Sequence, residues 1–205
     1  MDASVEVRTG VADRLLALSV GFAAVLAGTM PALSADLEDP LSPLTSTKGS
    51  MLCFRRDYSP EHLAQHPRQT TKSVLLAFQE RGFDVTIVLT PRTGAPKRIA
   101  AGCAWSQRAG IDTSDRQMIE DFHKTAGFDC MATLGGGSAV EGGYLLIDPA
   151  RDAKSLTLFL QNPLYAFDEK PGKAKGFMKL GPEDLTFALT RIEPKACAPF
   201  KAVTD

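Results

Sequence analysis

The chain has 205 residues, of which 44% are hydrophobic and 23% charged, and its formal net charge at pH 7 is -1. This is the composition of an ordinary globular protein. It excludes a collagen, a coiled coil, a low-complexity chain and a strongly basic nucleic-acid-binding protein, and the length allows one domain with its own hydrophobic core.

The chain begins with the pattern of an export signal. Residues 15–30 are sixteen residues without a charge, Arg14 precedes them, and the small residues Ser34 and Ala35 follow. The run is shorter than the roughly 20 residues of a membrane span, and small residues suit a signal peptidase. We therefore predict a signal peptide over residues 1–35, although its start is less positive than usual. An uncleaved anchor helix and an apolar core helix are the alternatives.

Cleavage after Ala35 would leave a mature chain without net charge. The leader carries two of the 23 basic and three of the 24 acidic side chains, so 21 of each remain. This balance provides no long-range field to attract nucleic acid or anionic lipid. Since no later segment reaches membrane length, we expect neither a nucleic-acid partner nor a transmembrane segment in the mature chain.

A lead-in and a short helix open the mature chain. Residues 36–50 contain prolines and small polar residues without periodicity, which predicts a flexible lead-in. Ser59, Pro60 and Glu61 then supply a capping residue, a first-turn proline and an acidic side chain, which together indicate a helix start. Pro67 ends this helix.

Strands with one buried face are predicted for most of the remaining chain. Hydrophobic residues alternate through residues 83–90, and residues 70–79 precede them as the other half of a hairpin. Further strand candidates are residues 51–57, 98–105, 127–133, 142–148, 155–161 and 185–192. A capping box and the pair Met118 and Phe122 predict a second short helix over residues 114–127.

These elements predict an all-β, mainly antiparallel fold over residues 51–205. Seven or eight short strands with two short helices form either a small barrel or a sandwich, because so few helices could not cover a parallel sheet. We expect a single disulfide-stabilised domain.

Four cysteines, all beyond the predicted leader, indicate two disulfides. Cys53, Cys103, Cys130 and Cys197 form no CxxC pair, which argues against a zinc ribbon or a redox motif. Three pairings are possible. We favour Cys103 with Cys130 and Cys53 with Cys197, because the end strands of a closed antiparallel sheet meet. A catalytic thiol is disfavoured, since exposed thiols oxidise in such compartments.

Two histidines form a candidate metal site. His62 and His66 are four residues apart in PEHLAQHP, a spacing that places both on one helix face. The metalloprotease pattern needs Glu directly after the first His, but Leu63 stands there. A third ligand would have to come from elsewhere, and histidines on a short helix between prolines are also typical of a solvated surface.

The Gly-rich residues 133–144 form a candidate contact loop. They lack the Lys of a phosphate-binding loop and the second Gly of a nucleophile elbow. We expect a hairpin loop whose glycines adopt positive φ. Because loops on rigid sheets often carry binding surfaces, we predict contact residues here: Gly135, Gly136, Gly137, Ser138 and Glu141.

Residues 162–182 predict a long loop rich in Lys, Gly and Pro. Tyr165, Phe167 and Phe177 place aromatic groups among its lysines, a mixture suited to docking a partner. The same loop is equally suited to covering one end of the sheet.

Two segments carry a resemblance to known proteins. CFRRDYSPEHLAQHP and LTFALTRIEPKAC, with two cysteines around a Gly-rich turn between them, resemble exported proteins of unassigned function from Gram-negative bacteria. The resemblance implies a periplasmic or secreted disulfide-bonded β domain, and it implies no catalytic residues. Periplasmic lysozyme inhibitors are also small disulfide-bonded β barrels, but the SGxxY-type loop is absent, because Ala139 follows Ser138.

Together these features predict an exported, non-enzymatic β domain that binds a protein partner or an envelope component through loops at one end of the sheet. We recognise no catalytic triad, no frame of paired carboxylates and no cofactor fingerprint, so we expect no cofactor. The alternatives are a metal-binding protein using His62 and His66 and a periplasmic hydrolase inhibitor of the lysozyme type. The oligomeric state is left open.

Overall fold

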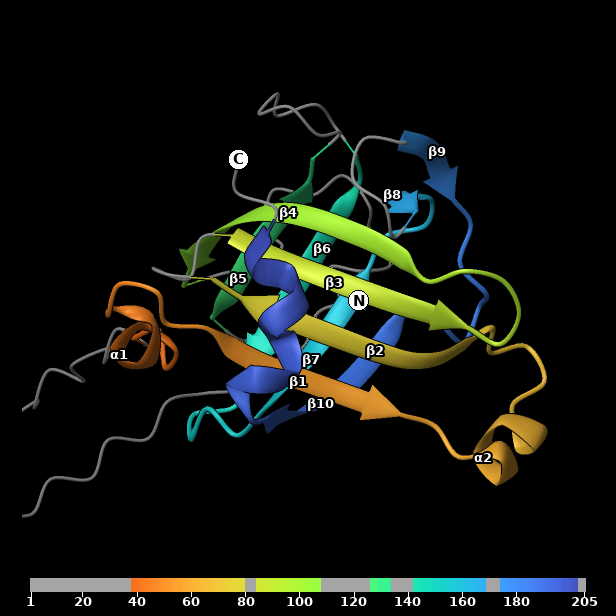
Figure 1. The fold of residues 1–205 in the computed structure, drawn as a ribbon, viewed down its shortest axis with the longest axis horizontal. Helices are drawn as coiled ribbons and strands as arrows, with labels where there is room; N and C mark the ends of the chain where they lie inside the picture. Colours follow the sequence, from red (N-terminus) through yellow and green to blue (C-terminus); the bar gives the residue numbers. More distant parts are fainter. Residues whose placement is uncertain (1–37, 80–83, 108–125, 134–141, 169–173, 203–205) are drawn as a thin grey trace, which may run out of the picture. The chain divides into compact units, whose positions relative to one another are not determined.

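The computed structural model describes residues 38–79, 84–107, 126–133, 142–168 and 174–202 (Figure 1). Residues 36–205 form one compact unit. The predicted leader and residues 114–125 of the second predicted helix lie outside the described residues.

Strands dominate the described chain. They are β1 (Leu52–Asp57), β2 (Thr71–Phe78), β3 (Asp84–Pro91), β4 (Lys97–Ser106), β5 (Gly127–Ala132), β6 (Tyr144–Pro149), β7 (Ser155–Leu160), β8 (Leu164–Asp168), β9 (Ala174–Met178) and β10 (Thr186–Ile192). The helices are α1 (Ser42–Thr45), α2 (Pro60–Gln65) and the 3-10 helix η2 (Pro194–Ala202).

Eight strands close into an antiparallel barrel. Each strand from β1 to β6 pairs with the next one along the chain, and β10 pairs with both β7 and β1. Closure pairs both edges of every barrel strand, which removes the exposed edges of an open sheet. The predicted all-β, mainly antiparallel fold is confirmed, with the barrel realised rather than the sandwich.

Side chains fill the interior of the barrel. Alternate residues of β3, namely Val85, Ile87 and Leu89, point inward and are buried, as their period-two pattern predicts. They belong to one cluster of buried residues to which every barrel strand contributes. An eight-stranded barrel is just wide enough for side chains to fill, so this interior is a packed core. Its largest members are Phe54, Phe78, Phe128 and Phe187.

The 3-10 helix η2 lies on the outside of the barrel, across β1 and β2 (Figure 1). Cys53 on β1 and Ala77 on β2 point outward and pack with Cys197 of η2 and with Met51 in a second buried cluster. The sequence analysis did not predict this helix, because its prolines and lysine lack a helical periodicity.

Residues 162–182 do not form the long loop that we predicted. They contain the hairpin β8–β9, which joins the barrel where Phe167 and Asp168 pair with Arg98 and Lys97 of β4. The hairpin is short and its register shifts after Ala166, so its alternation is too weak to be recognised among the glycines and lysines.

Residues 36–50 are likewise not a featureless lead-in. Residues 42–45 form α1, and Leu41 is fully buried in the barrel core cluster. One apolar side chain of this segment thus packs into the core of the barrel.

Candidate functional site

The two disulfides have the nested pairing that the sequence analysis favoured. Cys103 and Cys130 are directly opposite each other on β4 and β5, inside the barrel. Cys53 and Cys197 join β1 to η2 on the outside. Two disulfides are consistent with an oxidising compartment.

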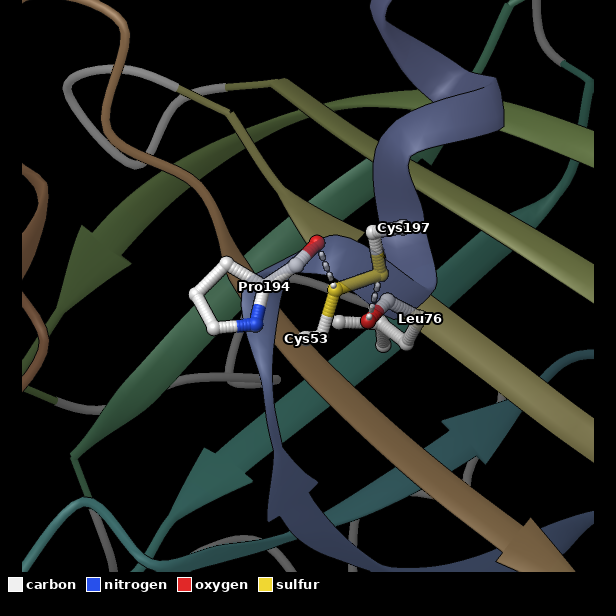
Figure 2. Close-up of a disulfide and its surroundings, with 4 residues drawn as sticks. All are labelled: Cys53, Leu76, Pro194 and Cys197. Atoms are coloured by element: carbon white, nitrogen blue, oxygen red, sulfur yellow. Dashed lines mark hydrogen bonds between the residues drawn. A yellow bond between two sulfur atoms is a disulfide. The ribbon is translucent and has the colours of Figure 1, made fainter.

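The outer disulfide holds η2 against two strands at once (Figure 2). The sulfur of Cys53 lies 3.4 Å from the carbonyl oxygen of Pro194 at the start of η2. The sulfur of Cys197 lies 3.8 Å from the carbonyl oxygen of Leu76 on β2. The position of η2 is therefore fixed relative to both β1 and β2.

An open groove with a volume of about 1090 Å³ lies beside this disulfide, and we call it the η2 groove. Residues 49–53 and 190–195 provide most of its lining, so it contains the start of β1 and the end of β10. Leu44 of α1, Lys154 of the turn between β6 and β7, and Ala198 of η2 complete its walls. The groove thus lies at one end of the barrel, where connecting segments meet.

Three basic side chains line the η2 groove from three different segments. The backbone N–H of Arg191 donates to the carbonyl oxygen of Lys154 at 2.7 Å, so these two residues are held next to each other. Lys195 follows four positions later in η2. Against these three cations, Glu193 is the one carboxylate among the lining residues that the structure describes.

Two of these cations have no ionic partner within the described ranges. Arg191 and Lys195 form no ion pair or side-chain hydrogen bond there. The ammonium of Lys154 lies 3.7 Å from the carboxylate of Asp152, and both groups are more than half exposed, so this pair is weak. An anion bound in the groove would supply the ionic partner that Arg191 and Lys195 lack among the described residues.

The floor of the η2 groove is apolar. Met51 and Ile192, which pack with Cys53 in the outer cluster, line it, and Leu44 adds a side wall that is 40% exposed. An exposed large aliphatic side chain next to a concave surface favours burial against an apolar ligand group.

Several polar groups around the floor already have hydrogen-bond partners. Cys53 and Ile192 are register partners in the β1–β10 ladder. The N–H and the hydroxyl of Ser50 donate at 2.9 Å to the carbonyl oxygens of Thr47 and Thr45, respectively. The polar recognition that the groove offers therefore comes mainly from its charged side chains.

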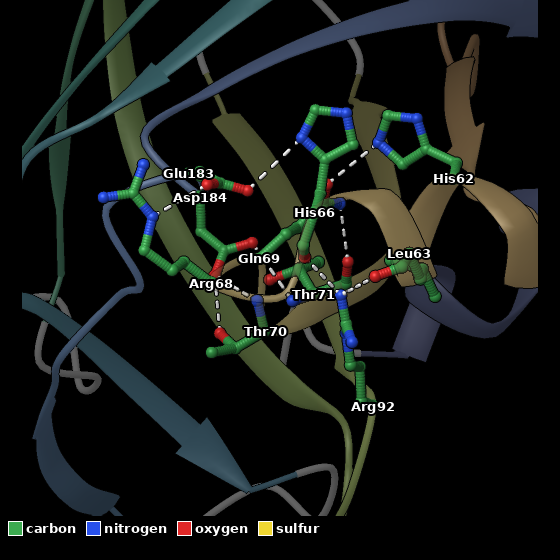
Figure 3. A network of polar contacts seen from close by, with 10 residues as sticks. All are labelled: His62, Leu63, His66, Arg68, Gln69, Thr70, Thr71, Arg92, Glu183 and Asp184. Atoms are coloured by element: carbon green, nitrogen blue, oxygen red, sulfur yellow. Dashed lines mark hydrogen bonds and ion pairs between the residues drawn. The ribbon is translucent and has the colours of Figure 1, made fainter.

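His62 lies on α2 and His66 caps the C-terminus of this helix, which follows β1 in the chain (Figure 3). The hydroxyl oxygen of Ser59 accepts from the N–H of His62, which confirms the predicted helix start. The two imidazole rings stack with centroids 4.2 Å apart. His62 Nε2 contacts Gln69 Oε1 at 3.0 Å, and His66 Nδ1 lies 3.3 Å from Glu183 Oε2.

The histidines thus have separate partners rather than one shared point of contact. Within the ranges that the structure describes, no group of three or more His, Cys, Asp or Glu side chains could hold a metal ion. The stack continues through Tyr58, whose ring lies 4.7 Å from that of His62, to Arg56, which lies 5.0 Å above the Tyr58 ring. Burial raises the pKa of Tyr58, and the ring packs against the barrel core.

A buried carboxylate that the sequence analysis missed fixes this end of the barrel. Asp184 is fully buried and accepts from the N–H and hydroxyl of Thr70 at 2.8 and 2.5 Å and from the N–H of Thr71 at 3.0 Å. These bonds join the segment before β10 to the start of β2. Three charge-assisted hydrogen bonds to one carboxylate indicate a structural role. No local pattern marks Asp184, because its partners are more than 110 positions away.

The predicted aromatic contact residues gather on the β8–β9 hairpin. Tyr165 lies edge-on to Phe167 and to Phe177, with ring centroids 5.3 and 5.5 Å apart. Phe177 is 57% exposed. The other predicted contact residues, Gly135, Gly136, Gly137, Ser138 and Glu141, lie outside the described residues.

Two carboxyl groups outside the α2 network have shifted pKa values. Burial raises the pKa of Asp148 on β6. Burial also raises the pKa of Asp39, although the Asp39 carboxylate accepts from the N–H of Leu41 at 2.8 Å. In both cases partial loss of hydration disfavours the charged form.

Among the described residues, no helix is long and apolar enough to span a membrane. Comparison with known proteins finds no matching protein-family model, no matching curated protein and no matching solved structure.

Proposed function

We propose that the mature chain is an exported, non-enzymatic binding domain that takes an anionic ligand in the η2 groove. One observation carries this proposal: Arg191 and Lys195, which have no ionic partner in the described part of the chain, stand with Lys154 around an apolar floor. A concave apolar surface with a few convergent charged groups is the usual form of a small-ligand site.

The framework around the groove supports the same proposal. The groove is built on β1 and β10, two paired strands of a closed barrel, and its η2 wall is anchored by the Cys53–Cys197 disulfide. Little conformational freedom remains to be lost when a ligand binds, which favours affinity. Both disulfides favour a periplasmic or secreted location, where they would persist.

Titration with the fluorescent anion 1-anilinonaphthalene-8-sulfonate tests this function, because the dye combines a sulfonate with apolar rings. The wild-type protein and the charge-reversed variant Arg191→Glu/Lys195→Glu are compared at low and moderate salt. The control Arg151→Glu/Lys72→Glu makes the same change in net charge at exposed positions outside the groove.

We expect saturable dye binding to the wild type and to the control, at least tenfold weaker binding to the charge-reversed variant, and weakening by added salt. Equal dye affinity in all three proteins would contradict an anion site in the η2 groove. Circular dichroism and thermal unfolding establish that the variants are folded.

A further inference from the structure

We infer that the ligand of the η2 groove is a single-chain anionic amphiphile. This inference rests on the proposed function and specifies its ligand. Its phosphate or carboxylate head would lie between Arg191, Lys195 and Lys154, and its alkyl chain would lie along Met51 and Ile192 toward Leu44.

Charge complementarity assigns the head group. The lining holds three cations against the single carboxylate of Glu193. A guanidinium pairs with carboxylate or phosphate oxygens through two parallel hydrogen bonds, and an ammonium adds a point charge. The zero net charge of the mature chain hides this local excess, because the compensating acidic side chains lie elsewhere on the protein.

The apolar floor of the groove indicates that the rest of the ligand is an alkyl chain. Alkyl groups need no hydrogen bonds, and the β1–β10 ladder and Ser50 have already used their main-chain groups. At these positions a peptide backbone would lose hydration without gaining partners, which is costly. An alkyl chain therefore fits the floor better than a peptide does.

The volume of the groove is sufficient for one alkyl chain. Its volume of about 1090 Å³ is at the upper end of the range for small-ligand sites, and it is open to solvent on one side. Full burial of one methylene changes affinity about fourfold, and an open groove buries each methylene only in part. We therefore expect each added methylene to tighten binding about two- to fourfold.

Isothermal titration calorimetry of the oxidised protein tests this assignment with four probes below their micelle concentrations. Octyl phosphate and decyl phosphate share a head and differ in tail length. Decyl maltoside has the decyl tail with an uncharged head, and inorganic phosphate has no tail. The variant Leu44→Ser shortens the apolar wall, and Phe177→Ser removes an exposed hydrophobic side chain away from the groove.

We expect decyl phosphate to bind about four- to sixteenfold more tightly than octyl phosphate, and at least tenfold more tightly than decyl maltoside or inorganic phosphate. Leu44→Ser should weaken decyl phosphate binding at least threefold, and Phe177→Ser should leave it unchanged.

Equal affinity for octyl phosphate, decyl phosphate and inorganic phosphate would overturn the amphiphile while leaving the anion site intact, provided that Arg191→Glu/Lys195→Glu abolishes binding. Equal binding of decyl phosphate and decyl maltoside would overturn the assigned head group. Decyl phosphate binding that is absent, or insensitive to charge reversal, would overturn the proposed function as well.

Discussion

Cys53 and Cys197 are 144 positions apart in the chain, yet the disulfide brings their Cα atoms to 5.9 Å. Cys53 belongs to the floor strand of the η2 groove and Cys197 to its helical wall. One covalent bond thus closes a loop of 144 positions and holds η2 against β1.

Replacing both residues, Cys53→Ala/Cys197→Ala, should lower the free energy of unfolding by about 5 kcal/mol, because so long a loop restricts the unfolded chain strongly. The matched control Cys103→Ala/Cys130→Ala opens a shorter loop and should cost about 3.5 kcal/mol. Guanidinium unfolding measures both values. Binding of decyl phosphate should be lost in the first variant and kept in the second, and the reverse order would contradict the role given to η2.

Asp184→Ala should destabilise the protein by about 3 kcal/mol or more, since it leaves the buried N–H group of Thr71 and the partly buried N–H group of Thr70 without their acceptor. Its neighbour Glu183 provides the control. Glu183 pairs with Arg68 and His66, whose side chains are 71% and 45% exposed, so Glu183→Ala should cost less than about 1 kcal/mol. Urea unfolding distinguishes the two, and equal losses would argue against Asp184 as the link between β2 and β10.

Gly142→Ala should destabilise the barrel by at least about 2 kcal/mol, because the added Cβ would lie 2.5 Å from the carbonyl oxygen of Ala132. Gly102→Ala is the comparison, since a Cβ there meets nothing within 4 Å and the residue lies in strand β4. This second change should be neutral or stabilise by up to about 1 kcal/mol. Thermal unfolding of both variants checks the expectation, which fails if Gly142→Ala is tolerated as well as Gly102→Ala.

Asp148→Asn should stabilise the protein at pH 7. Burial raises the folded-state pKa of Asp148 above its ordinary value of 3.8, so ionisation costs more in the folded than in the unfolded protein. The wild type therefore loses stability as the pH rises through 3.8 toward the raised value, and the asparagine variant does not.

The stability difference between Asp148→Asn and the wild type should accordingly be present at pH 7 and should shrink as the pH falls below about 4. Melting temperatures across this range measure it. Asp152→Asn removes an exposed carboxylate from the next turn and should bring no such gain. A gain that is constant with pH would point to a cause other than ionisation.

The strands were largely predictable, because a half-buried strand shows its alternation locally. Residues 83–90 alternate as β3 does, and Ser59 caps α2 as its sequence indicates. Closure of the barrel could not be predicted in the same way, since it depends on the pairing of β10 with β1, which are more than 130 positions apart in the chain. The β8–β9 hairpin was missed because it is short and shifts register.

The η2 groove could not be predicted from the sequence. Its three cations lie at positions 154, 191 and 195, in a turn, a strand and a helix. The net charge is a sum over the whole protein. It therefore gave no indication of an anionic partner and did not reveal the local excess of basic residues in the groove. The two histidines, by contrast, have a spacing that is conspicuous in sequence, yet in the structure they stack on each other beside Gln69 and Glu183.

Amide NMR spectra of isotope-labelled protein titrated with decyl phosphate test the binding site most directly, because they report on all three candidate surfaces at once. Saturable shifts should concentrate at Ser50, Ile192 and Lys195. Shifts confined to the aromatic hairpin around Phe177, or to His62 and His66 on α2, would contradict an anion-binding η2 groove.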